Sequence, residues 1–326
     1  MLYPEFIKKG QTIGICAPSA GAGHKLDSLK ESNRVLRAKG YKVKESASVR
    51  KNGVRSASGK KRGKELNELI SDKKVKTVIA AKGGVYMLEM LPYIDFDNIK
   101  NNPKWLCGMS DPTNMLFTCT TKCDIATLYG FNGSGFTMKS NKPQTMFFNY
   151  LKGNIKTQNS YKYYQTFIET INDVKICKQE VKWISKNPVN ITGRIIGGCI
   201  EVIEKIIGSE YDSTNEFIER YKDDGIIWYF DVFDMSSLNF YLTLLQFKNA
   251  GWFKYCKGVL IGRVAFPTVE DKRLDYIKAA DKALGKIPHI CEMDIGHTNP
   301  SMVMINGAIA SVKCRNGKGS ISFKLK

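Results

Sequence analysis

Over the first 150 residues, short apolar runs alternate with amphipathic stretches, and this alternation limits the folds that the chain can adopt. The apolar runs lie at 11–19, 41–48, 75–84 and 104–111, and the amphipathic stretches between them lie at 26–40 and 60–72. Short runs that end in small or polar residues are typical of buried strands that lead into loops. Strands separated by helices predict βαβ units, and therefore an α/β fold with a parallel sheet.

The alternation weakens after about residue 150. Residues 156–190 are polar and rich in lysine and aromatic residues, and we interpret them as a connector with irregular strands. A second unit is predicted over 191–326, because ITGRIIGG, the apolar strand IIWYFD and the helix SLNFYLTLLQF follow one another there. The expected domains are therefore 1–155 and 191–326, joined by the connector, a division that a length of 326 residues allows.

The chain carries a formal net charge of +19, from 50 lysine and arginine residues against 31 acidic ones. Of these 50 residues, 40 are lysines, and they are spread along the whole chain. Recognition of bases and phosphates favours arginine, whose planar guanidinium presents paired donors, so this excess indicates a solvated surface and no nucleic-acid partner. A nucleotide- or nucleic-acid-binding protein stays open as an alternative, because Gly21 and Gly23 form part of a dinucleotide-binding pattern whose third glycine is missing.

The cysteines and the N-terminus indicate the compartment. The nine cysteines are an odd number, and most lie in apolar runs, as is typical of buried thiols in a reducing environment. Cys119 and Cys123 are the one close pair, and no second pair or nearby histidine completes a zinc site. The N-terminus lacks the order of a secretory signal, and no run approaches the roughly 18 apolar residues that span a bilayer. We therefore expect a cytoplasmic protein without a metal or a membrane partner.

Predicted loops follow the buried strands, at the position where parallel sheets bind ligands. Gly83 and Gly84 allow a backbone N–H to approach a ligand closely, or simply make a turn. Ser110 follows an apolar strand and precedes Asp111 and Pro112, where a helix is expected to begin. A serine there lies near unpaired amides of the helix N-terminus; in the alternative interpretation, Ser110 or Asp111 only caps the helix.

Imidazole chemistry has few candidates, because His24, His289 and His297 are the only histidines. His297 lies in a loop after the apolar run HICEMDI, where catalytic groups are often presented, whereas His289 fits equally well as a packed strand residue. Asp231 and Asp234 end the aromatic strand IIWYFDVFD. A carboxylate at the end of a buried strand needs a partner, and a histidine would meet that need while its ring is oriented.

Several segments together resemble the L,D-carboxypeptidase family of serine peptidases, which includes murein tetrapeptide carboxypeptidases and microcin C immunity peptidases. They are APS at 17–19, AAKGGVYMLEMLPYIDFD at 80–97, GMSD at 108–111, GRIIGG at 193–198, LLQFKNAGWFKYCKGVLIGR at 244–263 and GHTNP at 296–300. These segments occur in the family's order and span nearly the whole chain.

The resemblance implies a serine–histidine–glutamate triad. The nucleophile of the family's G-x-S-D turn falls on Ser110, and the histidine of its GH-(T/V) loop falls on His297. The acid falls on Asp231, where this chain has an aspartate in place of the usual glutamate, and Asp234 is the reserve candidate. The backbone N–H groups of Gly84 and Asp111 are expected to bind the oxyanion.

The resemblance also implies the fold and the activity. The fold is an N-terminal flavodoxin-like (glutamine-amidotransferase-like) domain and a C-terminal β/α domain, with the active site between them, often in a homodimer. The expected activity is removal of the terminal D-alanine from murein tetrapeptides during cell-wall recycling, without a metal or organic cofactor.

A second function keeps this chemistry and changes the substrate to a peptide–nucleotide toxin, as in the immunity peptidases. Trp183, or another aromatic residue of the connector, would then stack on the base. Two differences from the family affect substrate contacts: Cys199 stands where many members have asparagine, and Lys82 where they often have arginine.

Overall fold

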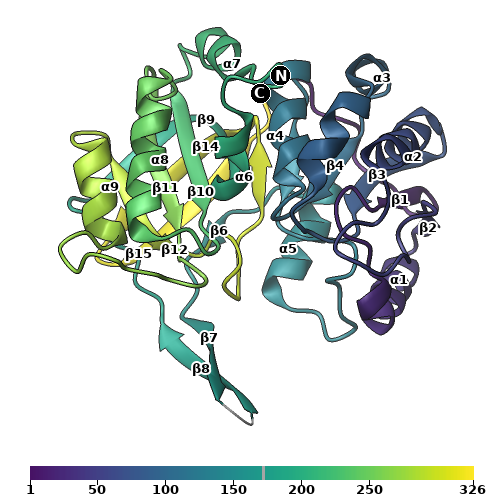
Figure 1. Cartoon of the computed structure of the whole chain (residues 1–326), viewed down its shortest axis with the longest axis horizontal. Coiled ribbons are helices and arrows are strands. Elements are labelled where there is room, and N and C mark those ends of the chain that lie inside the picture. Colours follow the sequence, from purple (N-terminus) through teal and green to yellow (C-terminus); the bar gives the residue numbers. More distant parts are fainter. Residues whose placement is uncertain (171–172) are drawn as a thin grey trace. The chain divides into compact units, whose positions relative to one another are not determined.

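The structure, a computed structural model, describes residues 1–170 and 173–326 and divides into two compact units (Figure 1). The first unit contains Met1–Lys156, Gly208–Ser213 and Val303–Gly307, and the second contains Thr157–Ile207, Thr214–Met302 and Ala308–Lys326. These bounds differ from the expected domains in three ways, of which one is that Gly208–Ser213 belongs to the first unit. The segment interpreted as a connector belongs to the second unit from Thr157 onward, and Val303–Gly307 belongs to the first, because its strand completes the first unit's sheet.

The first unit is built on a six-stranded sheet with the order β13-β5-β4-β3-β1-β2. Its strands are β1 (Thr12–Cys16), β2 (Lys42–Glu45), β3 (Val75–Ala80), β4 (Trp105–Gly108), β5 (Thr127–Tyr129) and β13 (Met304–Asn306). Strands β1 to β5 pair in parallel, and β13 is antiparallel to β5. The order β2-β1-β3-β4-β5 is that of flavodoxin-like folds, so the predicted fold class and parallel sheet are confirmed.

Helices follow the strands of the first unit, as βαβ units require. They are α1 (Leu26–Ala38), α2 (Gly59–Ser71), α3 (Phe96–Asn101), α4 (Thr113–Cys123) and α5 (Lys142–Leu151), with the 3₁₀ segments η1 (Gly23–Lys25) and η2 (Met87–Tyr93). The amphipathic pattern decides the orientation of α1, which buries Leu29, Val35 and Leu36. The hydroxyl of Ser58 accepts a hydrogen bond from the N–H of Lys61 and so fixes the start of α2.

The second unit is built on a seven-stranded sheet with the order β12-β11-β10-β9-β14-β15-β6. Its strands are β6 (Gln158–Asn159), β9 (Val189–Cys199), β10 (Ile226–Asp231), β11 (Cys256–Gly262), β12 (His289–Met293), β14 (Ile309–Arg315) and β15 (Lys318–Lys324). Strands β9 to β12 are parallel, and β14, β15 and β6 continue the sheet with antiparallel pairing. The predicted C-terminal β/α domain is therefore present.

The core of the second unit lies around β10, which is buried along its whole length. Its helices are α6 (Ile200–Ile203), α7 (Thr214–Arg220), α8 (Ser237–Asn249) and α9 (Tyr276–Leu284), with the 3₁₀ segment η3 (Glu204–Ile206). Helices α8 and α9 pack side by side (Figure 1). The rings of Trp228 and Trp252 stack with their centroids 5.4 Å apart. A strand buried on both faces reads as a continuous apolar run, which is why IIWYF was recognisable in the sequence.

The segment interpreted as irregular strands contains a regular hairpin, β7 (Tyr163–Thr170) and β8 (Asp173–Glu180). Its register is continuous from Tyr163 opposite Glu180 to Thr170 opposite Asp173, and it projects from the sheet of its own unit (Figure 1). The two strands are joined to each other by backbone hydrogen bonds and belong to neither large sheet, so their polar sequence lacks the apolar run of the sheet strands. None of the helices in the described part of the chain has the length and hydrophobicity that a bilayer crossing requires.

Candidate active site

In the first unit, the loops after β1, β3 and β4 meet at the carboxyl ends of these strands. The N–H of Ala20 donates to the carbonyl of Gly83 at 3.3 Å, and the N–H of Tyr86 donates to the hydroxyl of Ser19 at 3.1 Å. A Cβ atom added at Gly83 would lie 3.0 Å from the Cβ of Ser110, so the third loop packs directly on the second. This is the sheet edge at which parallel α/β folds bind ligands.

Ser110 has a left-handed backbone conformation, with a φ of 70°. Residues other than glycine adopt it rarely, at a cost of about 1–3 kcal/mol. The N–H of Ser110 donates to the Tyr129 hydroxyl at 3.1 Å, and its carbonyl accepts from the N–H of Thr113 at 2.8 Å. The N-cap of α4 is Pro112, so capping does not explain Ser110. A strained turn between a strand and a helix is how several hydrolase folds present a nucleophilic serine.

Gly84 occupies a position that requires glycine. Its φ is 148°, and a Cβ atom there would overlap with the hydroxyl of Ser19. Among the residues that the structure describes, no group accepts a hydrogen bond from the N–H of Gly84. An N–H in this state is suited to bind an anion that develops beside Ser110.

The side chain of Asp111 is buried and holds the turn in place. Its carboxylate accepts a hydrogen bond from the N–H of Met87 at 2.9 Å, at the start of η2, and another from the Asn114 side chain at 3.1 Å. The carboxylate therefore ties the loop that follows β4 to the one that follows β3. The sequence analysis considered the side chain of Asp111 only as a helix cap and its backbone N–H as an oxyanion donor, and it missed this link between the two loops.

In the second unit, His297 and Asp231 form a hydrogen-bonded pair. Asp231 is the last residue of β10, and its side chain is fully buried. The Nδ1 atom of His297 lies 3.0 Å from Oδ1 and 2.9 Å from Oδ2 of Asp231, and its backbone N–H donates to Oδ1 at 3.2 Å. The reserve candidate Asp234 is exposed. The structure thus brings Asp231 to the imidazole and leaves Nε2 as the nitrogen for proton exchange.

Two neighbours allow this close pairing. Gly296 has a φ of 96°, and a Cβ atom there would overlap with Oδ1 of Asp231, so only glycine lets the loop pass over the carboxylate. The ring of Phe233 lies with its centroid 4.5 Å from that of the imidazole. The His297 side chain keeps 14% of its surface exposed. The ring is therefore packed from one side while one edge stays accessible.

The surroundings of His297 have opposing effects on its pKa. Burial of the ring disfavours the imidazolium and lowers the pKa, but the charge and hydrogen bond of Asp231 favour it, with smaller contributions from Glu201 and Asp234. The net result is a raised pKa. A base whose protonated form is stabilised in this way can accept a proton and hold it until a leaving group needs it.

Glu201 is a residue that sequence reasoning missed. One oxygen of its carboxylate accepts hydrogen bonds from the backbone N–H groups of Phe233, Asp234 and Met235, at 2.7, 3.1 and 3.2 Å. The turn that follows Asp231 is thereby fixed. An acidic residue two positions after the GGC segment, in the first turn of α6, was the available signal.

Trp183 does not fit the role considered for it in the sequence analysis. Its side chain is 1% exposed, and its Nε1–H donates to Oδ2 of Asp294 at 3.0 Å. A ring enclosed in this way cannot stack on a nucleobase. Tyr163, at the start of β7, is 46% exposed and remains a candidate, whereas the side chain of Phe167 lies outside the described residues.

The two departures from the family pattern have identifiable surroundings. Cys199 lies opposite Asp231 in the register of β9 and β10, and its thiol donates to Glu201 at 3.0 Å. Burial and these carboxylates raise its pKa well above the usual value, so it is a neutral thiol. The Nζ of Lys82 lies 2.6 Å from Nε2 of His24. The charge of Lys82 lowers the pKa of His24, and burial lowers that of Lys82.

The remaining motifs have structural explanations. Cβ atoms added at Gly21 or Gly23 would overlap with the backbone of residues 51–52, so these glycines allow close packing of two loops. His289 binds Asp281 and the backbone carbonyl of Ile287. The described cysteines are free thiols, and that of Cys177 lies outside the described residues. Over the described ranges, no three His, Cys, Asp or Glu side chains gather as metal ligands.

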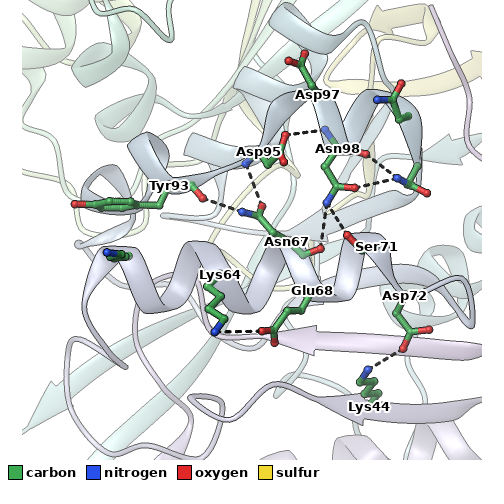
Figure 2. A pocket seen from close by; sticks show the side chains of 13 residues that line it. Lys44, Lys64, Asn67, Glu68, Ser71, Asp72, Tyr93, Asp95, Asp97 and Asn98 are labelled. Carbon is green, nitrogen blue, oxygen red and sulfur yellow. Dashed lines mark hydrogen bonds and ion pairs between the residues drawn. The ribbon is translucent and has the colours of Figure 1, made fainter.

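A separate open pocket of about 960 Å³ lies in the first unit, between α2 and the segment around α3 (Figure 2). Its lining is polar, and its side chains bond to one another: Asn67 to the carbonyl of Tyr93, Asn98 to Ser71, and Lys44 to Asp72. Ser110 does not line it. This pocket is therefore distinct from the loops that hold Ser110.

The chain matches one family over both of its parts. Residues 13–130 match the family described as LD-carboxypeptidase N-terminal domain, and residues 192–312 match LD-carboxypeptidase C-terminal domain. The Bacillus subtilis protein named "Putative carboxypeptidase YocD" is 26% identical, over 98% of each chain.

Solved structures share the fold. The microcin C7 self-immunity protein MccF, in complex with aspartyl sulfamoyl adenosine, superposes with a TM-score of 0.83 at 22% identity, over 99% of both chains. A muramoyltetrapeptide carboxypeptidase from Oxalobacter formigenes superposes with a TM-score of 0.76 at 18% identity, over 96% of this chain and 99% of its own.

Proposed function

Because the chain belongs to the LD-carboxypeptidase family of serine peptidases, we propose that it removes the terminal D-alanine from murein tetrapeptides. Ser110 Oγ attacks the carbonyl that joins the L-configured centre of the third residue to D-alanine. His297 Nε2 takes the hydroxyl proton and passes it to the leaving amine, so the C–N bond breaks and an acyl ester remains on Ser110. Water, activated by the same base, then hydrolyses the ester.

The observation that carries this proposal is the pairing of His297 with the buried Asp231. A carboxylate on Nδ1 fixes the tautomer, directs Nε2 outward and stabilises the imidazolium that forms during attack. The proposed chemistry requires Nε2 to come within about 2.6–3.2 Å of Ser110 Oγ when substrate is bound. The N–H groups of Gly84 and Asp111 would stabilise the oxyanion by roughly 3 kcal/mol per donor, as in other serine hydrolases.

Assembly and location belong to the same proposal. We expect a homodimer in the cytoplasm, where free thiols such as those of Cys107 and Cys291 stay reduced. Light scattering on the purified protein tests the assembly. A monomer at micromolar concentration that still releases alanine would separate the activity from dimer formation.

The activity is tested with a purified murein tetrapeptide, whose loss of one alanine is followed by mass spectrometry. Wild-type protein should produce the tripeptide, and Ser110→Ala should not. Ser134→Ala is the matched control, because Ser134 is a half-buried serine of the same unit whose hydroxyl donates to the carbonyl of Ala81 at 2.8 Å. Release of alanine by Ser110→Ala at the wild-type rate would remove Ser110 from the mechanism.

A second candidate is cleavage of a peptidyl nucleotide, which the similarity to MccF supports. In this chain, an exposed aromatic ring such as that of Tyr163 could stack on a base, while Trp183 is enclosed. An aspartyl or glutamyl sulfamoyl nucleoside, assayed beside the tetrapeptide, distinguishes the two. A higher kcat/KM for the nucleoside conjugate, lowered by Tyr163→Ala, would favour this second function.

A further inference from the structure

The guanidinium of Arg263, just beyond the end of β11, is buried beneath the loop that holds His297. Its side chain is 4% exposed. Nη1 donates to the hydroxyl of Thr298 at 3.1 Å, and Nη2 donates to Oδ1 of Asp294 at 3.2 Å and to the carbonyl of Glu292 at 3.0 Å. The Glu292 carboxylate lies 3.5 Å from Nε. Arg263 therefore bonds to residues on both sides of His297, which are Glu292 and Asp294 before it and Thr298 after it.

Asp294 connects the same loop to the segment that precedes β9. Its side chain is fully buried, and its Oδ2 atom accepts hydrogen bonds from Nε1–H of Trp183 at 3.0 Å and from the N–H of Tyr161 at 3.1 Å. The Arg263 guanidinium also lies over the ring of Tyr164, with its carbon 3.7 Å from the ring centroid. Every bond of this cluster lies within the second unit.

The backbone adds two contacts to this arrangement. The N–H of Gln165 donates to the carbonyl of Asn299 at 2.7 Å, and the N–H of Met302 donates to the carbonyl of Asp294 at 2.7 Å. The base of the β7–β8 hairpin is thus joined to the loop two residues after His297. The bond between Asp294 and Met302 joins the two ends of the loop that contains His297.

A buried ion pair adds little to stability, because the removal of two charges from water offsets most of their attraction. Arg263 and Asp294 fix orientation instead: the planar guanidinium presents several donors in a fixed fork, and three hydrogen bonds from it go to the loop or its flanks. We therefore expect this cluster to fix the position of a neighbouring group more than it stabilises the fold. The group whose position matters in this loop is the imidazole of His297.

We propose that Arg263 and Asp294 are positioning residues that hold the 294–298 loop so that the His297 ring stays on Asp231. They act through Thr298 and the backbone and touch no substrate. The proposal rests on the proposed function, in which His297 is the general base. Loss of the Arg263–Thr298 bond should let the ring leave Asp231, and a displacement of about 1 Å can lower a rate by about 100-fold.

The test compares Thr298→Val with Thr298→Ser. Valine keeps the shape of threonine and removes the acceptor for Nη1, whereas serine keeps the acceptor. The His297 pKa is measured by NMR on protein with ¹³C-labelled histidine, which is assignable because the chain has only His24, His289 and His297. In Thr298→Val we expect the pKa to fall toward the usual value of about 6.5 and kcat to fall about 10- to 100-fold with little change in KM. Thr298→Ser should restore both.

The matched control is the ion pair of Arg194 with Asp224, which lies at the start of β10, whereas Asp231 ends that strand. Arg194 is also buried, donates to Asp224 at 2.6 and 2.9 Å, and lies over a tyrosine ring, that of Tyr221, at 4.0 Å. Asp224→Asn should lower the melting temperature and leave the His297 pKa unchanged. Arg263→Lys, which keeps the charge but lacks the fork, should behave like Thr298→Val.

A wild-type His297 pKa and kcat in both Thr298→Val and Arg263→Lys would overturn the proposal. The NMR measurement needs no substrate, so it gives an answer even if the wild-type protein releases no alanine. A wild-type protein that releases no alanine would count against the proposed function and not against the positioning role. An equal pKa change in Asp224→Asn would instead assign the effect to general destabilisation and also overturn the positioning role.

Discussion

The Nδ1 atom of His297 lies 2.9 Å from Oδ2 of Asp231, at the end of a strand that is buried along its whole length. The two residues are 66 positions apart in the sequence. A fully buried carboxylate without a charged or hydrogen-bonding partner would be very costly, and here the partners are the imidazole and the backbone N–H of His297. The pair is therefore coupled in both directions: the carboxylate orients the ring, and the ring satisfies the carboxylate.

Asp231→Asn tests this coupling in the proposed enzyme. Loss of the negative charge should preserve the fold and lower kcat by about 10⁴, by analogy with other triads, because the amide favours the wrong tautomer. Asp234→Asn is the control, since Asp234 is exposed, and it should change kcat far less. Steady-state kinetics on the tetrapeptide measure kcat for both variants. An inactive Asp234→Asn beside an Asp231→Asn with wild-type kcat would make Asp234 the acid of the triad.

Asp231→Glu tests whether the negative charge at position 231 or the size of the side chain there matters more for activity. Glutamate keeps the charge and is the residue usual in the family, so this variant should retain much more activity than Asp231→Asn. However, Gly296 packs directly on the Asp231 carboxylate, so the extra methylene group must displace the loop. We therefore expect a lower melting temperature than in wild type. Activity as low as that of Asp231→Asn would show that fit, not charge, governs this position.

The left-handed conformation of Ser110 predicts a difference in stability between two inactive variants. Ser110→Ala removes the hydroxyl and keeps the unfavourable φ of 70°, whereas Ser110→Gly relieves it. Both should lose activity by several orders of magnitude. In denaturant titrations, Ser110→Gly should be the more stable by about 1 kcal/mol, even though glycine has more entropy to lose on folding. Equal stability of the two variants would indicate that the turn is not strained.

Gly83→Ala should displace the side chain of Ser110 while the hydroxyl group itself is kept. The new Cβ would lie 3.0 Å from the Cβ and 3.1 Å from the Oγ of Ser110, so the serine side chain must shift. Because small displacements of a reacting group are costly, we expect kcat to fall about 10- to 100-fold. Gly133→Ala introduces a contact of similar tightness, 3.1 Å from a methyl group of Ile15, and serves as control. Similar kcat losses in both variants would point to general misfolding instead.

The pH dependence follows from the raised pKa of His297. General-base catalysis needs the neutral ring, so the rising limb of kcat/KM should lie above the usual value of about 6.5. Burial opposes this shift, and Asp231, Glu201 and Asp234 are the carboxylates that favour the imidazolium. Asp231→Asn should therefore move the limb to lower pH. If the rising limb of kcat/KM lay at the same pH in Asp231→Asn as in wild type, the limb would report the titration of a group other than His297.

The same shift affects stability with a defined sign. A histidine whose pKa is higher in the folded state binds its proton more tightly there, so its contribution to stability is fully present below about pH 6.5. It is lost as the pH rises through the raised value. The stability difference between wild type and His297→Gln should therefore shrink between acidic and alkaline pH. Chemical denaturation at several pH values measures it, and a difference that grows with pH would contradict the pairing.

The sequence by itself predicted the buried strands and several helices, and its resemblance to the L,D-carboxypeptidase family pointed to Ser110, Asp231 and His297. Apolar runs such as VIAA and IIWYF predict buried strands because both faces of a parallel strand must be covered, and small or polar residues mark where each strand leaves the sheet. Each of these three residues lies at or after the end of such a run. The polar hairpin β7–β8 was not recognisable in the sequence, because backbone pairing leaves no hydrophobic pattern to read.

Only the tertiary structure decided which of these residues meet. Pairing of Asp231 rather than Asp234 with His297, and the burial of Trp183, depend on strand register and on loops that are distant in sequence. The bonds of Glu201 to the turn after Asp231, and of Arg263 to Thr298, join residues more than 30 positions apart. Local periodicity carries no information on such contacts, because they arise when packing brings separate strand ends to one edge of a sheet.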